Sequence, residues 1–372
     1  MFIRIPVVNL WRRPVRTMLT AAGVAIAVAG FVAMLGFSAG VSHAWVASFE
    51  AKGTHVLGVR KGAVEILSTS LDATVVEEVR LVPGVADVAA ELLDLTPLDS
   101  GETVMLCGWQ PGGFLWRALD LRNGRLPAPG EKDAVVAGRA LADALESRVG
   151  DRIRIVDRDY RIVGIAEGSA TILGSALIMP LAALQELLNR PGLVTVIDLR
   201  LKSPQNEGAT QQVMATLHER FPGVTFTESD RLAEKNWVLN VLAAVATVTS
   251  GIGLVLGIVI LLNTLLMSVT ERTRELGILL ALGWTQGRIV AMVLLEAIAV
   301  SLIGGVLGIV AGAVAVQWLA HSRILHGLVE PTVSVGVLVR TAIAVVVLGT
   351  LAAAYPAWRA TAIPVSRALR YE

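Results

Sequence analysis

The sequence predicts a multi-pass α-helical membrane protein with four transmembrane helices and one inserted, mixed α/β extracytoplasmic domain. Three observations support this fold class: an excess of apolar residues, four long apolar runs, and a polar segment of mixed pattern between the first two runs. Hydrophobic residues make up 54% of the chain and charged residues 17%, against about 45–50% and about 25% in soluble domains. This composition excludes a disordered chain and disfavours an ordinary soluble enzyme. The formal net charge of +1 shows no excess of basic residues for binding nucleic acid.

Four runs are long enough to cross a bilayer, whose hydrocarbon core requires about 20 apolar residues of helix. Residues 17–49 and 236–270 contain no Asp, Glu, Lys or Arg. Residues 289–322 are interrupted only by Glu296, and residues 341–358 are uncharged. Buried helices of one soluble protein rarely reach this length four times, so each run is predicted to span the membrane.

The first two runs are longer than one membrane crossing requires. At 1.5 Å of rise per residue, each would form a helix of about 50 Å. We therefore expect both helices to continue outside the membrane as a stalk, the alternative being an uncharged loop. Ser42-His43-Ala44 resembles a signal-peptide cleavage site, but the apolar stretch before it exceeds the usual length of about 7–15 residues. The first helix is therefore expected to be retained.

Basic residues predict the orientation, because short cytoplasmic loops carry an excess of Lys and Arg. Arginines gather in the N-terminal segment, in the 271–288 loop and in the C-terminal tail, whereas the loop before the fourth run has only Arg323, with Arg340 at its border. Both termini are therefore predicted to be cytoplasmic. The charge divides accordingly, since residues 42–237 carry a net −6 and the remaining chain +7. The arginines that set this orientation are Arg4, Arg12, Arg13, Arg16, Arg272, Arg274, Arg288, Arg359, Arg367 and Arg370.

The segment between the first two runs has the pattern of a mixed α/β domain. Apolar residues alternate with polar ones at Ile153 and Ile155 and again at Tyr160 and Ile162, which predicts a hairpin that turns near Asp157. Pro-Gly pairs mark turns between other elements. The expected strands are 54–59, 86–95, 104–107, 153–156, 161–165 and 194–201, and the expected helices are 72–81, 138–147, 181–188 and 208–221.

This domain shows no catalytic or metal-binding pattern. Cys107 is the only cysteine, which excludes disulfides within the chain and multi-cysteine metal sites, and the five histidines lack metal-ligand spacing. The aromatic group of Trp109, Phe114 and Trp116 has two interpretations, an apolar binding surface or packing between subdomains, of which packing is favoured. We predict no catalytic residue, no metal site and no bound cofactor in this chain, and a membrane-anchored enzyme is disfavoured.

Two features stand out within the apolar runs. Glycines recur every four residues, a spacing that lets helix backbones approach closely and so predicts helix-packing positions. Glu296 lies about 10 Å from the cytoplasmic end of its run, where an ionisable group is either a functional candidate or an interfacial carboxylate bonded to a neighbouring helix. The glycines are Gly253, Gly257, Gly304, Gly308 and Gly312, with Gly36 and Gly40 at the same spacing in the first run.

The loop between the second and third runs is predicted to contain a short amphipathic helix. Charged residues occur at its start, and Gly283 is placed to end it. Leu276, Leu279 and Leu280 share one helical face with Gly283. Such a helix lies on a membrane surface or docks in a groove of a partner protein, and these residues by themselves favour neither.

Several segments together resemble the permeases of the MacB/FtsX-type ABC transporter superfamily, over nearly the whole chain. The clearest is residues 271–283, which resembles the family segment E-R-x-R-E-I-G-x-x-x-A-x-G, with Leu276 at the Ile position. That segment and the C-terminal tail are specific in combination. The other similar segments are residues 9–20 before the first span, 124–126, 149–155 and 162–165 in the external domain, 295–297 with Gly304, Gly305 and Gly308 in the third span, and 355–360 and 368–372 in the tail.

The resemblance implies a homo- or heterodimer of four-helix permease subunits, of which the homodimer is expected, joined to two copies of an ABC ATPase. ATP and Mg²⁺ would bind to the ATPase, which is expected to be a separate polypeptide because this sequence has no G-x-x-x-x-G-K-[ST] phosphate-binding loop. Membrane lipid is a further expected partner, a periplasmic adaptor or outer-membrane component stays open, and nucleic acid is not expected. The segment 271–283 would be the coupling helix that touches the ATPase. Its expected ATPase-coupling residues are Glu271, Arg272, Arg274, Glu275, Leu276, Gly277, Leu279, Leu280, Ala281 and Gly283.

Two functions are consistent with this resemblance. The first is a permease that couples ATP hydrolysis by its partner to movement of the external domain, driving export or extraction of a lipid, lipoprotein, peptide or drug-like substrate by mechanotransmission. The second is an FtsX-like regulatory transducer that activates an external cell-wall hydrolase. The size of the external domain favours the first, and both are expected in the bacterial inner membrane.

The expected organisation follows from these boundaries. It comprises a cytoplasmic amphipathic helix at 1–16, the first transmembrane helix and stalk at 17–49, the extracytoplasmic domain at 50–235, the second stalk and transmembrane helix at 236–270, the coupling loop at 271–288, transmembrane helices at 289–318 and 336–358 with a short external loop at 319–335 between them, and a cytoplasmic tail at 359–372.

Overall fold

The chain forms two compact units in a computed structural model. The helical unit comprises residues 1–39, 243–317 and 332–372, and the sheet unit comprises residues 40–242 and 318–331. The expected helix before Pro14, Arg323 and the tail after Thr361 lie outside the described residues. The structure describes residues 14–62, 67, 70–99, 101–167, 171–231, 237–322 and 333–361.

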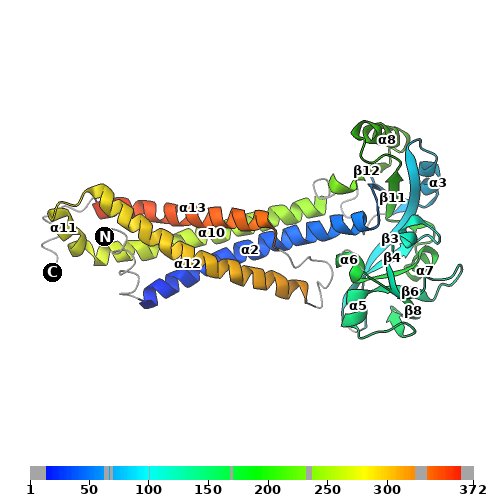
Figure 1. Cartoon of the computed structure of the whole chain (residues 1–372), viewed down its shortest axis with the longest axis horizontal. Helices are drawn as coiled ribbons and strands as arrows, with labels where there is room; N and C mark the ends of the chain where they lie inside the picture. Colours follow the sequence, from blue (N-terminus) through cyan, green and yellow to red (C-terminus); the bar gives the residue numbers. More distant parts are fainter. Residues whose placement is uncertain are drawn as a thin grey trace. The chain divides into compact units, whose positions relative to one another are not determined.

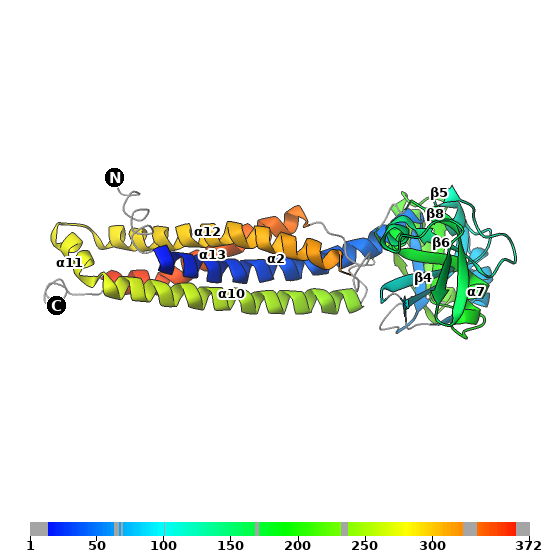
Figure 2. The ribbon, with the colours of Figure 1, turned by 90° about the horizontal axis from the view of Figure 1, so that it is seen from below.

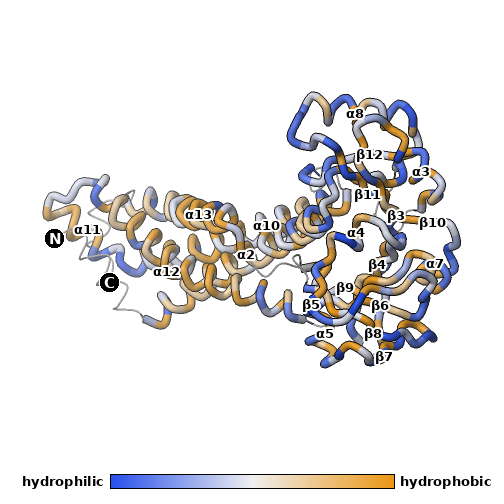
Figure 3. The backbone as a smooth tube through the Cα atoms, turned by 45° about the vertical axis from the view of Figure 1, so that its right-hand side comes forward, coloured by the Kyte–Doolittle hydropathy of each residue, from blue (hydrophilic) through white to orange (hydrophobic). Residues whose placement is uncertain are grey.

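Four long helices supply the helical unit, and all four are long and apolar enough to cross a membrane. Most of their residues are hydrophobic, as the hydropathy colouring along these helices shows (Figure 3). They run side by side in both views of the ribbon (Figures 1 and 2). The four are α2 (Pro14–Ala51), α10 (Trp237–Glu271), α12 (Gln286–Ala320) and α13 (Val335–Thr361).

The first two apolar runs each form a single uninterrupted helix. Helix α2 has 38 residues and helix α10 has 35, both more than the roughly 20 that a bilayer core requires. The last residues of α2, from Gly40 to Ala51, belong to the sheet unit. The alternative of an uncharged loop at these positions is therefore wrong. Both helices are long enough for a membrane span with further turns beyond it.

Glycines bring α12 close to α2 within the helical unit. A Cβ atom at Gly308 would lie 2.7 Å from the carbonyl oxygen of Ala25 and 2.7 Å from Val28, so no larger residue fits without moving a helix. Gly304 and Gly312 meet α2 in the same way one turn before and one turn after. On α10, Gly257 is similarly restricted by Ala27 of α2 and Leu348 of α13, whereas Gly253 has only Ala27 near it.

A large mixed sheet organises the sheet unit. Its strand order is β12-β1-β11-β3-β4-β9-β6-β8-β5, with β7 paired to β8, and a separate pair joins β10 to β2. The pairs β4–β9 and β6–β8 are parallel and the others antiparallel. The strands are β1 (Val56–Arg60), β2 (Leu71–Asp72), β3 (Val85–Pro97), β4 (Thr103–Trp109), β5 (Leu121–Gly124), β6 (Ala134–Gly138), β7 (Arg152–Ile155), β8 (Arg158–Ala166), β9 (Ala176–Pro180), β10 (Leu193–Val194), β11 (Val196–Leu201) and β12 (Val224–Glu228).

Both faces of this sheet are covered. Successive residues of β4 alternate between two apolar clusters: Val104 and Leu106 enter one, and Met105, Cys107 and Trp109 enter the other. Helices α3, α7 and α8 contribute to the first cluster, and the end of α2 with α4 and α6 contributes to the second. The short helices are α3 (Thr74–Arg80), α4 (Phe114–Arg117), α5 (Arg139–Ala144), α6 (Thr171–Gly174), α7 (Leu181–Leu187), α8 (Glu207–Arg220) and the 3₁₀ turn η1 (Ser229–Arg231).

The predicted hairpin near Asp157 is confirmed, since β7 pairs with β8 and Ile153 lies opposite Tyr160. The six expected strands and four expected helices all occur, with ends displaced by a few residues. The sequence analysis missed β2, β5, β6, β9 and β12. The residues of β6 and β9 are all buried, and these two strands show no polar alternation because helices and loops cover both faces of the sheet there.

Candidate functional site

The loop between α10 and α12 folds into one short helix, α11 (Thr273–Ala281). Arg272 precedes α11 with φ −105° and ψ 15°, so the chain changes direction between α10 and α11. Gly283 follows it with φ +88°, and the Gly283 N–H donates to the carbonyl oxygen of Leu280 at 3.0 Å. Glycine suits this position because residues with a Cβ rarely adopt a positive φ, so Gly283 ends α11 as predicted.

One face of α11 is packed into the helical unit. Leu276 is 3% exposed and belongs to an apolar cluster with Val269 of α10, Ile289 and Met292 of α12, and Ala357 of α13. Leu280 packs against the same cluster while partly buried. Burial of a leucine side chain contributes about 1.5–3 kcal/mol, so this contact holds α11 on the ends of its neighbours.

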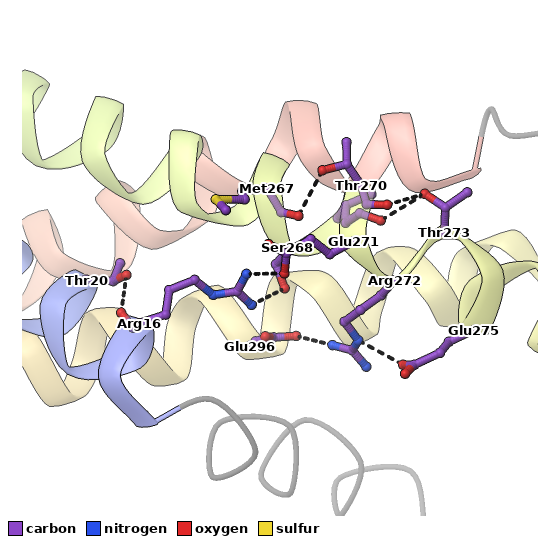
Figure 4. Close-up of polar contacts among 11 residues, drawn as sticks. Arg16, Thr20, Met267, Ser268, Thr270, Glu271, Arg272, Thr273, Glu275 and Glu296 are labelled. Carbon is purple, nitrogen blue, oxygen red and sulfur yellow. Dashed lines mark hydrogen bonds and ion pairs between the residues drawn. The ribbon is translucent and has the colours of Figure 1, made fainter. Parts of the chain in front are cut away.

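Ion pairs fix the start of α11 to α12. The guanidinium of Arg272 donates to Glu275 at 3.1 Å from Nε and to Glu296 of α12 at 3.4 Å from Nη1. Figure 4 shows Arg272 lying between these two carboxylates. Arg272 and Glu296 have only 15% and 12% of their side chains exposed. Glu296 thus has a partner on the connection between two helices, which is the hydrogen-bonded carboxylate that the sequence analysis weighed against a functional group.

A second ion pair joins α2 to the end of α10. Nη1 of Arg16 lies 2.9 Å from Glu271, and Nη2 donates to Ser268 at 3.0 Å (Figure 4). Exposed ion pairs contribute only about 0–1 kcal/mol, and these side chains are partly exposed. Their main effect is geometric, because the two arginines hold the ends of α2, α10, α11 and α12 in one arrangement.

The opposite face of α11 is open to solvent or to a partner. Ile278 is 43% exposed and Leu282, which follows the helix, is 74% exposed. They are four residues apart and therefore share a face. Arg274, Glu275 and Ala281 are exposed beside them. Apolar residues flanked by opposite charges on a short helix are typical of a protein-docking surface.

The structure divides the ten residues expected to contact an ATPase. Leu276 and Gly277 are buried within the unit, so they position α11 rather than face outward. Ile278 and Leu282 were not among the expected residues, because the sequence analysis took the face of Leu276 as the contact face, and that face is buried against α12. The partly buried residues are Arg272, Leu279 and Leu280, and the exposed ones are Glu271, Arg274, Glu275, Ala281 and Gly283.

The sheet unit contains no cluster of three or more His, Cys, Asp or Glu side chains that would hold a metal, as far as the described residues extend. Trp109, Phe114 and Trp116 are all buried, and the rings of Trp109 and Trp116 meet edge to face at 5.3 Å. Packing is therefore confirmed for these aromatics, and an apolar binding surface is wrong. Cys107 is 1% exposed.

The sequence analysis also missed a buried group of charges in the sheet unit. Lys52, Glu91 and Asp198 have side chains at most 3% exposed and lie close together. The available signal was weak: Glu91 and Asp198 each lie between apolar neighbours, but their strands, at 85–97 and 196–201, also carry other charged residues. Buried charges are rarely tolerated unless they are paired, so such positions predict a partner.

These features define a class of protein: a four-helix membrane protein with an α/β domain inserted after the first helix and a short packed helix between the second and third. The profile of the MacB-like periplasmic core domain matches residues 17–217, and that of the FtsX-like permease C-terminal region matches residues 247–365. The chain therefore belongs to the MacB/FtsX-type family of ABC transporter permeases.

Curated relatives include bacterial and archaeal proteins. The macrolide export ATP-binding/permease protein MacB of Bdellovibrio bacteriovorus is 26% identical over 96% of this chain and 60% of its own length. MacB of Shewanella sp. (strain W3-18-1) is 25% identical over 79% of this chain and 49% of its own length. An uncharacterized ABC transporter permease of Methanocaldococcus jannaschii is 28% identical over 64% of this chain. The chain spans about half to three-fifths of the length of these relatives.

Two solved structures are similar to the sheet unit at low sequence identity. The extracellular domain of the noncanonic ABC-type transporter YknZ from Gram-positive bacteria has a TM-score of 0.36 and 15% identity, covering 47% of this chain and 98% of that domain. The periplasmic region of MacB from Actinobacillus actinomycetemcomitans has a TM-score of 0.40 and 14% identity, covering 50% of this chain and 94% of that region.

Proposed function

We propose that this chain is a permease subunit that couples ATP hydrolysis by a separate ABC ATPase to a conformational change of its extracytoplasmic sheet unit. The change drives export or extraction of a lipid, lipoprotein, peptide or drug-like substrate by mechanotransmission. Family membership supports the permease role and an ABC ATPase partner. ATP and Mg²⁺ belong to that partner in this proposal, and two ATPase copies serve a dimer of permeases.

The exposed face of α11 is the observation that carries this proposal. It presents Ile278 and Leu282 between Arg274 and Glu275, while Leu276 is packed on three long helices. A partner that binds this face therefore acts on the arrangement of the helices themselves. That is the property required of a coupling helix.

The orientation is part of the proposal. Four spans that follow one another along the chain cross a membrane in alternating directions. The start of α2, the connection between α10 and α12, and the end of α13 are therefore on the same side, and these ends carry Arg16, Arg272, Arg274 and Arg359. The excess of arginine there supports a cytoplasmic location. Residues 40–242 would then be extracytoplasmic, and an adaptor or outer-membrane component would meet this side.

Thiol labelling tests this orientation. Because Cys107 is buried, a membrane-impermeant reagent should label it from the outside of intact cells only after mild unfolding with urea. A matched Arg274→Cys variant in a Cys107→Ala background should react only once the membrane is opened. Labelling of Cys107 from the cytoplasmic side alone would contradict the orientation.

A second copy of the chain is the permease partner that α10 supports. Ile252, Leu256, Val259 and Met267 form an exposed apolar stripe on this helix, with Asn263 at the same spacing. The Asn263 amide makes no hydrogen bond within the described chain, although polar groups inside a bilayer need partners. A two-fold axis would place the Asn263 amide of the second copy opposite that of the first.

A disulfide tests this dimer face. Asn263→Cys in a Cys107→Ala background should form an intermolecular disulfide under oxidising conditions, and absence of the disulfide would argue against this face.

A regulatory transducer is the second candidate, because the FtsX-like permease region matches residues 247–365. It would use the same ATPase contact to activate an external cell-wall hydrolase. Purification distinguishes the two. The tagged full chain, solubilised from native membranes, should retain an ABC ATPase and hydrolyse ATP. An adaptor in the eluate supports export and a hydrolase supports regulation, whereas a folded chain without any ATPase contradicts both.

A further inference from the structure

Lys52 is the first residue after helix α2, and its side chain is almost completely buried. Its ammonium lies 2.5 Å from Oε2 of Glu91 on β3 and 3.9 Å from Oδ1 of Asp198 on β11. It also lies over the ring of Phe49, 4.1 Å from the centroid. The ammonium therefore joins the end of α2 to the two central strands of the sheet.

The two carboxylates reach the same place because of strand register. Glu91 pairs with Val196, and Asp198 lies two residues further along β11, so both side chains point to the face that α2 covers. Glu91 accepts a hydrogen bond from the Trp109 indole at 2.5 Å. Asp198 Oδ1 accepts one from the Thr54 hydroxyl at 2.8 Å. Each of the two carboxylates is thus held by Lys52 and by one further hydrogen-bond donor, Trp109 for Glu91 and Thr54 for Asp198.

The charges of the cluster do not balance when all three groups are ionised. One ammonium faces two carboxylates, and Oδ2 of Asp198 is buried without a hydrogen-bond donor among the described residues. An uncompensated buried charge costs several kcal/mol, so such a site takes up a proton instead. Glu91 and Asp198 both lie beside the Lys52 ammonium, so one proton shared by the two carboxylates would balance the charge of the cluster.

The pKa shifts agree with this geometry. Burial raises the pKa of Asp198 to about 7; Lys52 opposes the shift and Glu91 adds to it. Burial lowers the pKa of Lys52, but Glu91 and Asp198 outweigh it, so the net shift is upward and Lys52 stays charged. Burial, together with Glu91, raises the pKa of the nearby Cys107 thiol, which stays neutral. Below about pH 7, Asp198 therefore holds a proton beside the charged Lys52.

Arg200 of β11 also holds the end of α2, because its side chain donates hydrogen bonds to backbone carbonyls there. Its Nη2 donates to the carbonyl oxygen of Lys52 at 2.9 Å and its Nε to that of Gly53 at 3.0 Å. These carbonyls follow the last turn of α2, where a cation compensates the helix dipole. The guanidinium also lies 4.4 Å from the centroid of Phe114.

A small cavity borders the cluster at Lys52. It has a volume of about 30 Å³ and is lined by Lys52, Trp109 and Ala51, with Asp120 and Glu167 among its polar lining residues. A cavity of about 10–15 Å³ already holds one water molecule. Water in this cavity would therefore contact Lys52, whereas Glu91 and Asp198 lie behind it.

We infer that Lys52, Glu91 and Asp198 form a proton-binding site that locks the end of α2 to strands β3 and β11. The bound proton lies between Asp198 and Glu91, and Lys52 is the positioning residue. If the proposed function is right, this lock is where movement of α2 enters the sheet unit. The lock itself needs no ATPase, so it is tested independently of that function.

Infrared difference spectra of the full chain in lipid test whether the cluster binds a proton. Between about pH 5 and about pH 9, a carboxylic acid band that disappears with a midpoint near neutral pH is expected. Asp198→Asn, which keeps the shape and a donor toward Glu91, should remove this band, whereas Asp133→Asn, at a carboxylate between β5 and β6, should leave it. An unchanged band in Asp198→Asn would overturn the proton site.

Spin-label distances test the lock. Cysteines at the exposed positions Glu50 and Lys202, in a Cys107→Ala background, should give one narrow distance distribution in the parent and in Asp198→Asn. Lys52→Met should broaden it at least about twofold. If Lys52→Met does not fold, the uncharged triple variant Lys52→Met, Glu91→Gln, Asp198→Asn replaces it, because it leaves no unpaired buried charge. A distribution that stays narrow in the folded variant would overturn the lock.

Discussion

Aspartate at positions 278 and 282 is expected to detach the chain from its ATPase, with each substitution weakening the association at least about 30-fold. Central apolar residues of an interface typically contribute about 2 kcal/mol each, which corresponds to that factor. A carboxylate in a docked, desolvated position adds a further penalty. Ile278 and Leu282 are exposed in the free chain, so the fold and membrane insertion should survive.

Co-purification of the ATPase with tagged variants measures this effect, and ATP hydrolysis in the eluate gives a second readout. Leu81→Asp is the matched control, since Leu81 is 77% exposed and belongs to the sheet unit, whereas α11 belongs to the helical unit. Leu276→Asp should behave differently and destabilise the helical unit, because Leu276 is buried. Wild-type amounts of ATPase on the Ile278→Asp, Leu282→Asp variant would remove α11 as the docking helix.

The stability of the sheet unit is expected to fall as pH rises from about 4 to about 7. The pKa of Asp198 is raised from 3.8 to about 7 by burial, with Lys52 opposing the shift, so the folded state holds a proton in this range that the unfolded state releases. The resulting stabilisation is complete below about pH 4 and is lost as pH approaches 7. The slope contributed by one proton is at most about 1.4 kcal/mol per pH unit.

Reactivity of the single cysteine reports this slope. Cys107 is buried in the folded sheet unit, so the urea midpoint for thiol labelling of the full chain follows unfolding at each pH. Subtracting the same titration of Asp198→Asn isolates the contribution of Asp198 from that of all other groups. A difference that stays flat from pH 4 to 7 would mean that Asp198 is ionised throughout.

The membrane helices could be predicted from the sequence because the absence of charged residues decides where a chain can cross a bilayer. The absence of charged residues over 17–49 and 236–270 fixed the extents of α2 and α10 to within three residues. The strands β6 and β9 could not be predicted, since a short apolar segment buried on both faces shows no alternation of apolar and polar residues. Their identity depends on neighbours that lie far away in the chain.

The sequence predicted which segment forms the candidate coupling helix, but not which of its residues are exposed. The composition of 271–283 indicated a short helix between spans, and Gly283 indicated its end. Which face is buried depends on α12 and α13 packing over Leu276, and this contact has no local signature. The pairing of Arg272 with Glu296 and of Lys52 with Glu91 likewise depends on tertiary structure, although the isolated charge within its apolar run marked Glu296 as a position that needs a partner.

Photo-crosslinking from position 278 in native membranes tests the central claim most directly. A photoreactive amino acid in place of Ile278 should crosslink to one ABC ATPase, and an otherwise identical chain with the group at Leu81 should not. Addition of Leu282→Asp to the first chain should abolish the crosslink. A chain that folds and inserts normally but crosslinks only to lipid or to proteins without ATPase activity would contradict the account.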